Sequence, residues 1–272
     1  RRELARAWVT LDQFNRIAIS FAEAAGHPDC LTDAGRYAGQ VAFGSEAAGR
    51  WMLRAGFRFL TSPSIGLRQL PRSARLLNTN KQWYLLQDGQ RRRHELVKVV
   101  FARGPNGEPA REPLHDVWSL LFFVRGNLEA VAPLWAGQDK IGRVAYRIID
   151  LDPVAVVELL MPGTTASFDS GELRVDGRSV GRTVYLSRSE EHGGEYVGHY
   201  TTEASSDSDV RAAVLMTSDV SSLNHRSGEM RPILRKGEVF AIPGQPIGTT
   251  VVEFSWRETL LSRLFGSIFR RK

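Results

Sequence analysis

The stretch His115–Gly137, HDVWSLLFFVRGNLEAVAPLWAG, carries the clearest fold signal in this 272-residue chain. It holds two tryptophans, two phenylalanines and four leucines, and its large apolar residues recur at helical spacing. Arg125 and Glu129 interrupt the apolar run, which therefore falls short of the roughly 18–20 residues of a membrane span. We expect a core helix in which Trp118 and Phe122 are buried and Arg125 or Glu129 reaches solvent or a polar partner.

The first third of the chain reads as helical. Thr10 and Gln13 have the spacing of a capping box at the start of TLDQFNRIAISFAEAAG. The residues predicted to share the apolar face of this helix are Leu11, Phe14, Ile17, Ala18 and Phe21. Two further helical regions are predicted over 45–60 and 63–80.

Strand signals begin at Lys81. Residues 81–87 and 90–104 read as two strands joined by Asp88-Gly89, a dipeptide typical of tight hairpin turns. Another strand is expected over 140–152, and from Asp152 onward helical periodicity is almost absent while short β-rich segments follow one another.

These elements predict an α+β fold with N-terminal helices packed on an antiparallel sheet. We expect a helix-and-sheet domain over 1–150 and a β-rich domain or large insertion over 151–256. Residues 257–272 read as an amphipathic basic helix.

Composition narrows the class of protein. Hydrophobic residues make up 42% and charged residues 24%, which argues against disorder. The formal charge of +6 is a mild bias toward anionic partners, and the single cysteine, Cys30, excludes an intramolecular disulfide and fits a reducing cytoplasm. Because the sequence begins with Arg1 rather than Met, we expect it to be part of a longer protein.

No motif for catalysis or metal binding stands out. The six histidines form no ligand pair, no nucleophile elbow is present, and Cys30 with His27 upstream reads as a small buried side chain. We therefore expect no metal and no cofactor. An enzyme whose site is assembled from dispersed residues is the alternative, and its candidate residues are His115, Asp116, Glu129 and His199.

The sequence gives little support for a binding site for phosphate, haem or nucleic acid. The chain lacks a Walker loop and a GxGxxG turn. YLSRS (185–189) differs from the haem-propionate motif Y-x-S-x-R by one position, which reverses the strand face of its arginine. The basic residues 91–93 follow a turn and lack a recognition-helix pattern, so a nucleic-acid-associated protein is only an alternative interpretation and not the expected one.

Several segments resemble the bacterial sensor domains of the 4-vinyl reductase and haem-nitric-oxide-binding-like superfamily. The matching residues are Asn80–Lys81 at the start of a hairpin, Gly126 to Trp135 in RGNLEAVAPLW, and VVEFSW at 251–256. The resemblance spans about residues 5–150 and implies an input module of histidine kinases, cyclases or other signalling proteins. Family members often carry cysteines after the apolar helix and near the last strand, which this chain lacks, and the stretch 151–250 exceeds the family's compact core.

The resemblance implies a non-enzymatic sensory or regulatory module that binds a small apolar ligand or a protein partner. Aromatic residues predicted to line its pocket are Trp83, Tyr84, Trp118, Phe122, Phe123, Trp135 and Tyr146. Signal output is expected through residues 257–272, by homodimerisation in a cytoplasmic protein. The same segment, Arg257 to Lys272, would suit an anionic membrane surface, which makes a membrane-peripheral protein a further alternative.

Overall fold

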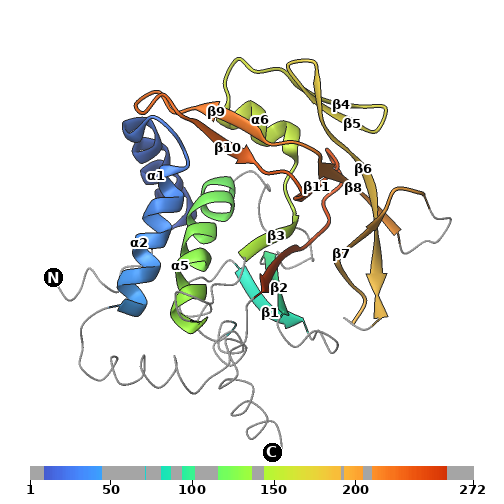
Figure 1. Ribbon diagram of the computed structural model, residues 1–272, viewed down its shortest axis with the longest axis horizontal. Coiled ribbons are helices and arrows are strands. Elements are labelled where there is room, and N and C mark those ends of the chain that lie inside the picture. Colours follow the sequence, from blue (N-terminus) through green and yellow to red (C-terminus); the bar gives the residue numbers. More distant parts are fainter. Residues whose placement is uncertain are drawn as a thin grey trace, which may run out of the picture.

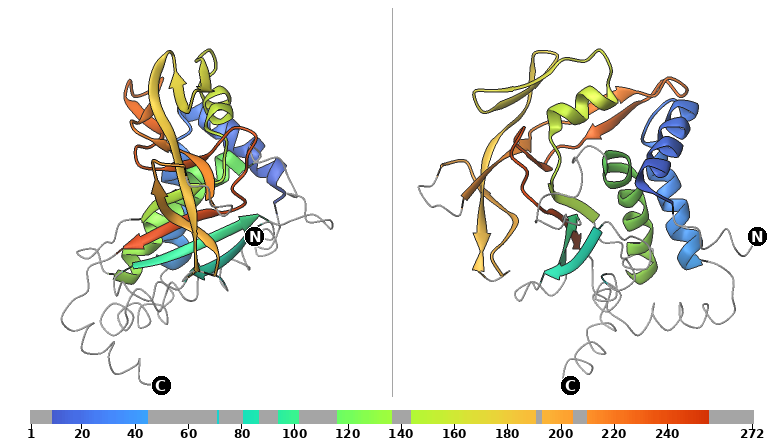
Figure 2. Two further views of the ribbon diagram at one scale, coloured as in Figure 1. Left: turned by 90° about the vertical axis from the view of Figure 1, so that its right-hand side faces the viewer. Right: turned by 180° about the vertical axis from the view of Figure 1, so that it is seen from behind.

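The fold is α+β, as predicted. The computed structural model describes residues 9–44, 71, 81–86, 94–101, 116–136, 144–190, 193–204 and 210–255. Figures 1 and 2 show a layer of helices standing beside a large twisted sheet. Apart from Pro71, the helices predicted over 45–60, 63–80 and 257–272 lie outside the described residues.

Helix α1 (Leu11–Ala25) begins with the predicted capping box. The Gln13 N–H donates to the Thr10 hydroxyl at 3.2 Å, and the Thr10 N–H donates to the Gln13 side chain at 2.9 Å. Gly26 ends the helix with a φ of 81°, a left-handed conformation that costs glycine little.

The apolar stripe predicted on α1 is only partly buried. Ala18 is buried and Phe14 packs against the core, whereas Ile17 is 63% exposed and Phe21 is also exposed. The stripe is wider than the contact surface, because α2 and the central helix cover only one edge of α1.

Helix α2 (Cys30–Gly44) packs tightly against α5 (Arg125–Ala136). Gly35 of α2 faces the backbone of Phe123 so closely that a side chain at position 35 would overlap the Phe123 carbonyl oxygen. Only glycine allows two helix backbones to approach in this way.

The predicted central helix is present, but its first half is a π-helix. Segment η3 (Trp118–Val124) runs directly into α5. Phe122 is fully buried, as predicted, and Trp118 is half-buried. Arg125 and Glu129 both reach polar partners, which confirms that prediction.

In the described part of the chain, ten strands form one mixed sheet. Its order is β1-β2-β12-β3-β11-β8-β6-β5-β4, with β7 paired to the free part of β6, while β9 and β10 form a separate two-stranded sheet. The strands are β1 (Lys81–Leu86), β2 (His94–Phe101), β3 (Val144–Ile149), β4 (Ala166–Asp169), β5 (Glu172–Val175), β6 (Arg178–Ser189), β7 (Glu195–Thr201), β8 (Val210–Met216), β9 (Val220–Leu223), β10 (Met230–Leu234), β11 (Val239–Ala241) and β12 (Thr250–Ser255).

The pairing departs from a purely antiparallel sheet at one point. β11 runs parallel to β3, which the long connection between them permits. The predicted hairpin of β1 and β2 is present with Leu86 opposite Leu96, and its turn lies outside the described residues. Strand β12 lies between β2 and β3, so the ranges 1–150 and 151–256 contribute to the same sheet.

A β-bulge changes which side chains of β3 face the helices. The register between β3 and β12 shifts between Val251 and Val252. Tyr146 consequently belongs to the core on the helix side, whereas Ile148 belongs to the core on the opposite side. Regular alternation would place both residues on one face, and the bulge displaces this pattern by one residue.

Helix α6 (Pro153–Leu160) was not predicted. Its cap is Asp152, whose carboxylate accepts hydrogen bonds from the Val154 and Ala155 amides at 2.9 and 3.3 Å. Proline at the first helical position needs no amide donor and has a suitable φ. Helical periodicity is weak here, but the Asp152 cap and the burial of Val156 and Val157 favour a helix.

Candidate functional site

A buried polar cluster joins the first strand of the sheet to the start of η3. The Lys81 ammonium donates to the Asp116 carboxylate at 2.9 Å and to the Ser119 hydroxyl at 3.2 Å. All three residues are buried. Removing an ion pair from water is costly, and the cost is offset only when the pair has good geometry and its other hydrogen-bonding groups are satisfied. The contacts with Asp116 and Ser119 therefore fix the position of the Lys81 ammonium.

Trp83 lies on the same face of β1 as Lys81, two residues farther along. It is 4% exposed and belongs to the apolar core that contains Val117, Leu120 and Leu121. Its indole Nε1–H is buried and has no hydrogen-bond partner. A buried indole N–H usually finds an acceptor, and leaving it without one costs about 1–3 kcal/mol.

Segment η3, which contacts β1 through Ser119 and Lys81, has π-helical geometry. A π-helix is uncommon in proteins and is often found at functional sites. The ring centroids of Trp118 and Phe122 are 6.4 Å apart, and Phe123 meets Phe14 of α1 edge-to-face at 5.5 Å. One aromatic pair thus lies within η3, and the other joins η3 to α1.

The predicted pocket residues fall into different environments. Trp83, Phe122 and Tyr146 are buried, and Trp118 and Phe123 are half-buried. Tyr84 is 39% exposed, because it points away from the helices on the opposite face of β1. The side chain of Trp135 lies outside the described residues.

Tyr146, a predicted pocket residue, also connects β3 to η3. Its hydroxyl donates to the Leu120 carbonyl at 2.8 Å, and the Arg125 guanidinium lies over its ring at 4.9 Å from the centroid. Burial raises the pKa of the Tyr146 hydroxyl. The side chain thus binds β3 to η3 as a neutral donor.

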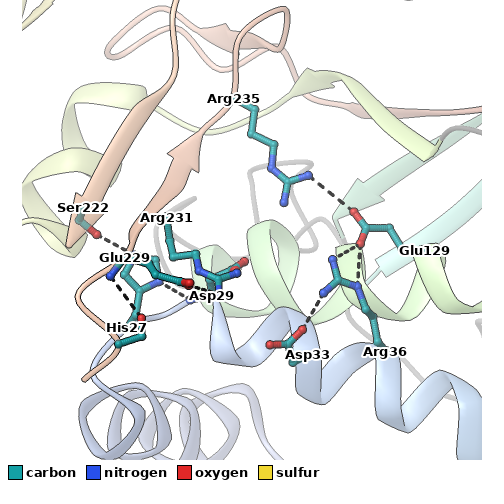
Figure 3. Close-up of polar contacts among 10 residues, drawn as sticks. His27, Asp29, Asp33, Arg36, Glu129, Ser222, Glu229, Arg231 and Arg235 are labelled. Carbon is teal, nitrogen blue, oxygen red and sulfur yellow. Dashed lines mark hydrogen bonds and ion pairs between the residues drawn. The ribbon is translucent and has the colours of Figure 1, made fainter. Parts of the chain in front are cut away.

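A second polar cluster connects the helices to the segment around β10. Figure 3 shows Arg36 of α2 and Arg235 approaching Glu129 of α5 from two sides. Arg36 contacts Glu129 at 2.6 Å and Asp33 at 2.6 Å, whereas Arg235 lies 3.6 Å from Glu129. Burial lowers the pKa of Arg235, and the nearby Arg125 acts in the same direction.

Beneath this cluster, Arg125 pairs with Glu238 at 2.6 Å in the core. Burial raises the pKa of the Glu238 carboxyl, while the Arg125 charge opposes that rise. The pair joins α5 to the turn before β11.

The third group of contacts lies at the turn between α1 and α2. His27 Nε2 is 2.8 Å from the Ser222 hydroxyl of β9, and the Asp29 amide donates to His27 Nδ1 at 2.9 Å. Since Nδ1 accepts, Nε2 carries the proton and donates to Ser222. A general base would need a free lone pair toward the serine, so this pair does not have the resting geometry of a serine nucleophile.

The residues of the alternative enzyme site are not brought together. Asp116 pairs with Lys81, and Glu129 lies farther along the central helix with Arg36. His199 is exposed on β7, and His115 lies outside the described residues. Within the described ranges, no three His, Cys, Asp or Glu side chains converge to hold a metal ion.

Cys30 has the environment of a structural thiol. Burial raises its pKa to about 11, and the carboxylates of Asp29 and Asp33 act in the same direction. Thiol nucleophiles need a lowered pKa, so the pairing of Cys30 with His27 as a reactive site lacks support.

Comparison with family models, with curated proteins and with solved structures found no match to this chain. Among the described helices, none is long and apolar enough to cross a membrane.

Sequence reasoning missed the Lys81–Asp116 and His27–Ser222 contacts. Each joins segments far apart in the chain, and the sequence offers no signal that selects one lysine or histidine among several. The charged residues in an otherwise apolar helix were the one useful hint, since Arg125 and Glu129 each had to find a partner.

Proposed function

We propose that this protein is a non-enzymatic sensory or regulatory module of a bacterial signalling protein, with a small-molecule site between β1 and η3. The observation that carries the proposal is the buried Trp83 Nε1–H without an acceptor. The adjacent π-helix and aromatic side chains support it. The likeness to sensor domains of the 4-vinyl reductase and haem-nitric-oxide-binding-like superfamily is part of the same proposal.

The chemistry around Trp83 favours a particular class of ligand. The surrounding core is apolar, and the charge of Lys81 is already offset by Asp116. An added carboxylate would be a buried charge without a counter-ion, which is costly. The proposed ligand is therefore a neutral, mainly apolar molecule with one hydrogen-bond acceptor that receives the Trp83 N–H.

Acetophenone and cumene form a suitable pair of probes, because the two have similar shapes and only acetophenone has a carbonyl acceptor. In a ¹H–¹⁵N spectrum of the full chain, acetophenone should shift the Trp83 indole signal downfield, and cumene should not. The signal is assigned by its loss in Trp83→Phe. Tyr84→Phe is the matched control, because Tyr84 lies on the exposed face of the same strand.

Native mass spectrometry of the purified chain gives an independent readout. We expect a retained small molecule in the wild type and in Tyr84→Phe, and weaker retention in Trp83→Phe. A bare polypeptide mass, together with no response of the Trp83 indole to either probe, would overturn the proposal.

Signal output remains part of the proposal. We infer that ligand binding at η3 is passed along α5 to partners through residues 257–272, in a cytoplasmic homodimer. The continuity of η3 with α5 supports such a path. Size-exclusion chromatography with light scattering should show a dimer, and a monomer at all concentrations would contradict this part of the proposal.

A further inference from the structure

The turn between α1 and α2 is held against the β9–β10 hairpin by polar contacts. The His225 amide donates to the Gly26 carbonyl at 3.2 Å, and Arg231 of β10 lies 3.8 Å from the Asp29 carboxylate. The centre of this contact is the His27 imidazole, which is 3% exposed. Figure 3 shows the His27 and Arg231 side chains side by side between the two elements.

Both ring nitrogens of His27 are occupied, and their roles are fixed. Nδ1 accepts the Asp29 N–H, and Nε2 donates to Ser222 Oγ. Only the neutral ring with its proton on Nε2 satisfies both contacts. A second proton, on Nδ1, would point directly at the Asp29 N–H.

We propose that His27 is a proton-sensitive latch: its neutral ring holds the α1–α2 turn on the β9–β10 hairpin, and its protonation releases that contact. The proposal is independent of the ligand site. It adds a pH-responsive connection between the helical layer and the hairpin.

Burial favours the neutral ring, and the surrounding charges act in both directions. Arg231 from β10 and His225 from the hairpin turn oppose a positive charge on His27, whereas Asp29 favours one. Arg231 also forms an ion pair with Glu229 at 2.5 Å. The Cγ atom of Arg226 lies near Gly26. Burial outweighs the effect of Asp29 and lowers the pKa of His27 below its ordinary value of 6.5.

A separate set of ion pairs joins the helices to the residue that follows β10. Glu129 of α5 contacts both Arg36 of α2 and Arg235, which follows β10. Release at His27 should therefore loosen the turn and the tip of the hairpin while leaving the Glu129 contacts in place. The expected change is local opening rather than unfolding.

Hydrogen–deuterium exchange of the full chain at pH 7.5 and pH 5.0 tests the latch, with labelling times scaled for the intrinsic pH dependence of amide exchange. In the wild type, peptides covering residues 22–31 and 219–231 should lose protection severalfold at pH 5.0, because the opened state binds a proton on His27 that the closed contact excludes. Peptides of β6 and β8 should not change.

The key variant is His27→Asn. The asparagine side chain can accept the Asp29 N–H in an Asx-turn but does not titrate, so protection should become independent of pH. His225→Gln is the matched control, because it removes the neighbouring histidine and should retain the wild-type pH response.

The proposal is overturned if wild-type protection is the same at both pH values, or if His27→Asn keeps the wild-type pH response. Should His27→Asn fail to fold, imidazole ¹⁵N spectra of the wild type decide the matter. They should show the Nε2–H tautomer and a midpoint below 6.5, shared by the amides of Val220–Leu223. A midpoint at or above 6.5, or β9 amides that do not titrate, would equally overturn it.

Discussion

Gly126 of α5 faces Thr32 of α2 at such short range that a Cβ at position 126 would overlap the Thr32 carbonyl oxygen. Gly35 makes the reciprocal contact with the Phe123 carbonyl. The two helices thus meet backbone to backbone, and neither carbonyl can move without moving its helix. This contact sets the position of η3, because η3 and α5 are continuous.

Gly126→Ala and Gly35→Ala should each destabilise the fold by about 2–4 kcal/mol, because the overlap exceeds what side-chain adjustment can relieve. Gly39→Ala is the graded control. A Cβ at position 39 would lie 3.0 Å from the Ala130 Cβ, a strain that the gain of about 1 kcal/mol in helix propensity largely offsets. Urea unfolding measures all three variants. Equal stabilities would show that the helices separate freely at this crossing.

Asp116→Asn should destabilise the protein by about 3–5 kcal/mol, because it removes the carboxylate that contacts the buried Lys81 ammonium at 2.9 Å. The double variant Lys81→Met/Asp116→Leu removes both charges and should regain most of that loss. For comparison, Arg174→Met breaks an exposed ion pair with Glu172 and should cost less than about 1 kcal/mol. A double variant no more stable than Asp116→Asn would mean that the pair itself stabilises the fold.

The sequence predicted the elements whose signals are local. The capping box at Thr10 and Gln13 and the pairing of β1 with β2 each depend on residues close in the chain, and the structure confirms them. Helix α2 was not singled out, because its small residues carry little periodicity. Their role is to let α5 approach, which is a property of the partner helix.

Long-range features could not be predicted. The partner of Arg125 is Glu238, 113 residues away, and nothing in either local sequence selects the other. The bulge in β3 also depends on its pairing with β12, a strand about 100 residues farther along the chain. Of the predicted pocket residues, Tyr84 was misplaced because an aromatic residue in a strand can face either side.

Tyr146→Phe should destabilise the protein by about 1–2 kcal/mol, because the buried Leu120 carbonyl loses the hydroxyl donor at 2.8 Å. The phenyl ring should keep its contact with the Arg125 guanidinium, so the change isolates the hydrogen bond. Tyr84→Phe, on the exposed face of β1, should change stability by less than about 0.5 kcal/mol. Thermal unfolding of the two variants measures the difference, and equal effects would remove Tyr146 as the link between β3 and η3.

Cys30 should react slowly with iodoacetamide in the folded protein. With a pKa of about 11, its thiolate fraction at pH 8 is about 100-fold below that of a thiol with the ordinary value of 9.0, so alkylation should slow by about that factor. The alkylation rate should continue to rise above pH 9, because the thiolate fraction of Cys30 increases with pH until the pH exceeds the pKa of the folded protein. The urea-unfolded chain provides the reference rate for the same residue. Rapid alkylation of the folded chain at pH 8 would indicate an activated thiol and would reopen the His27–Cys30 pair as a reactive site.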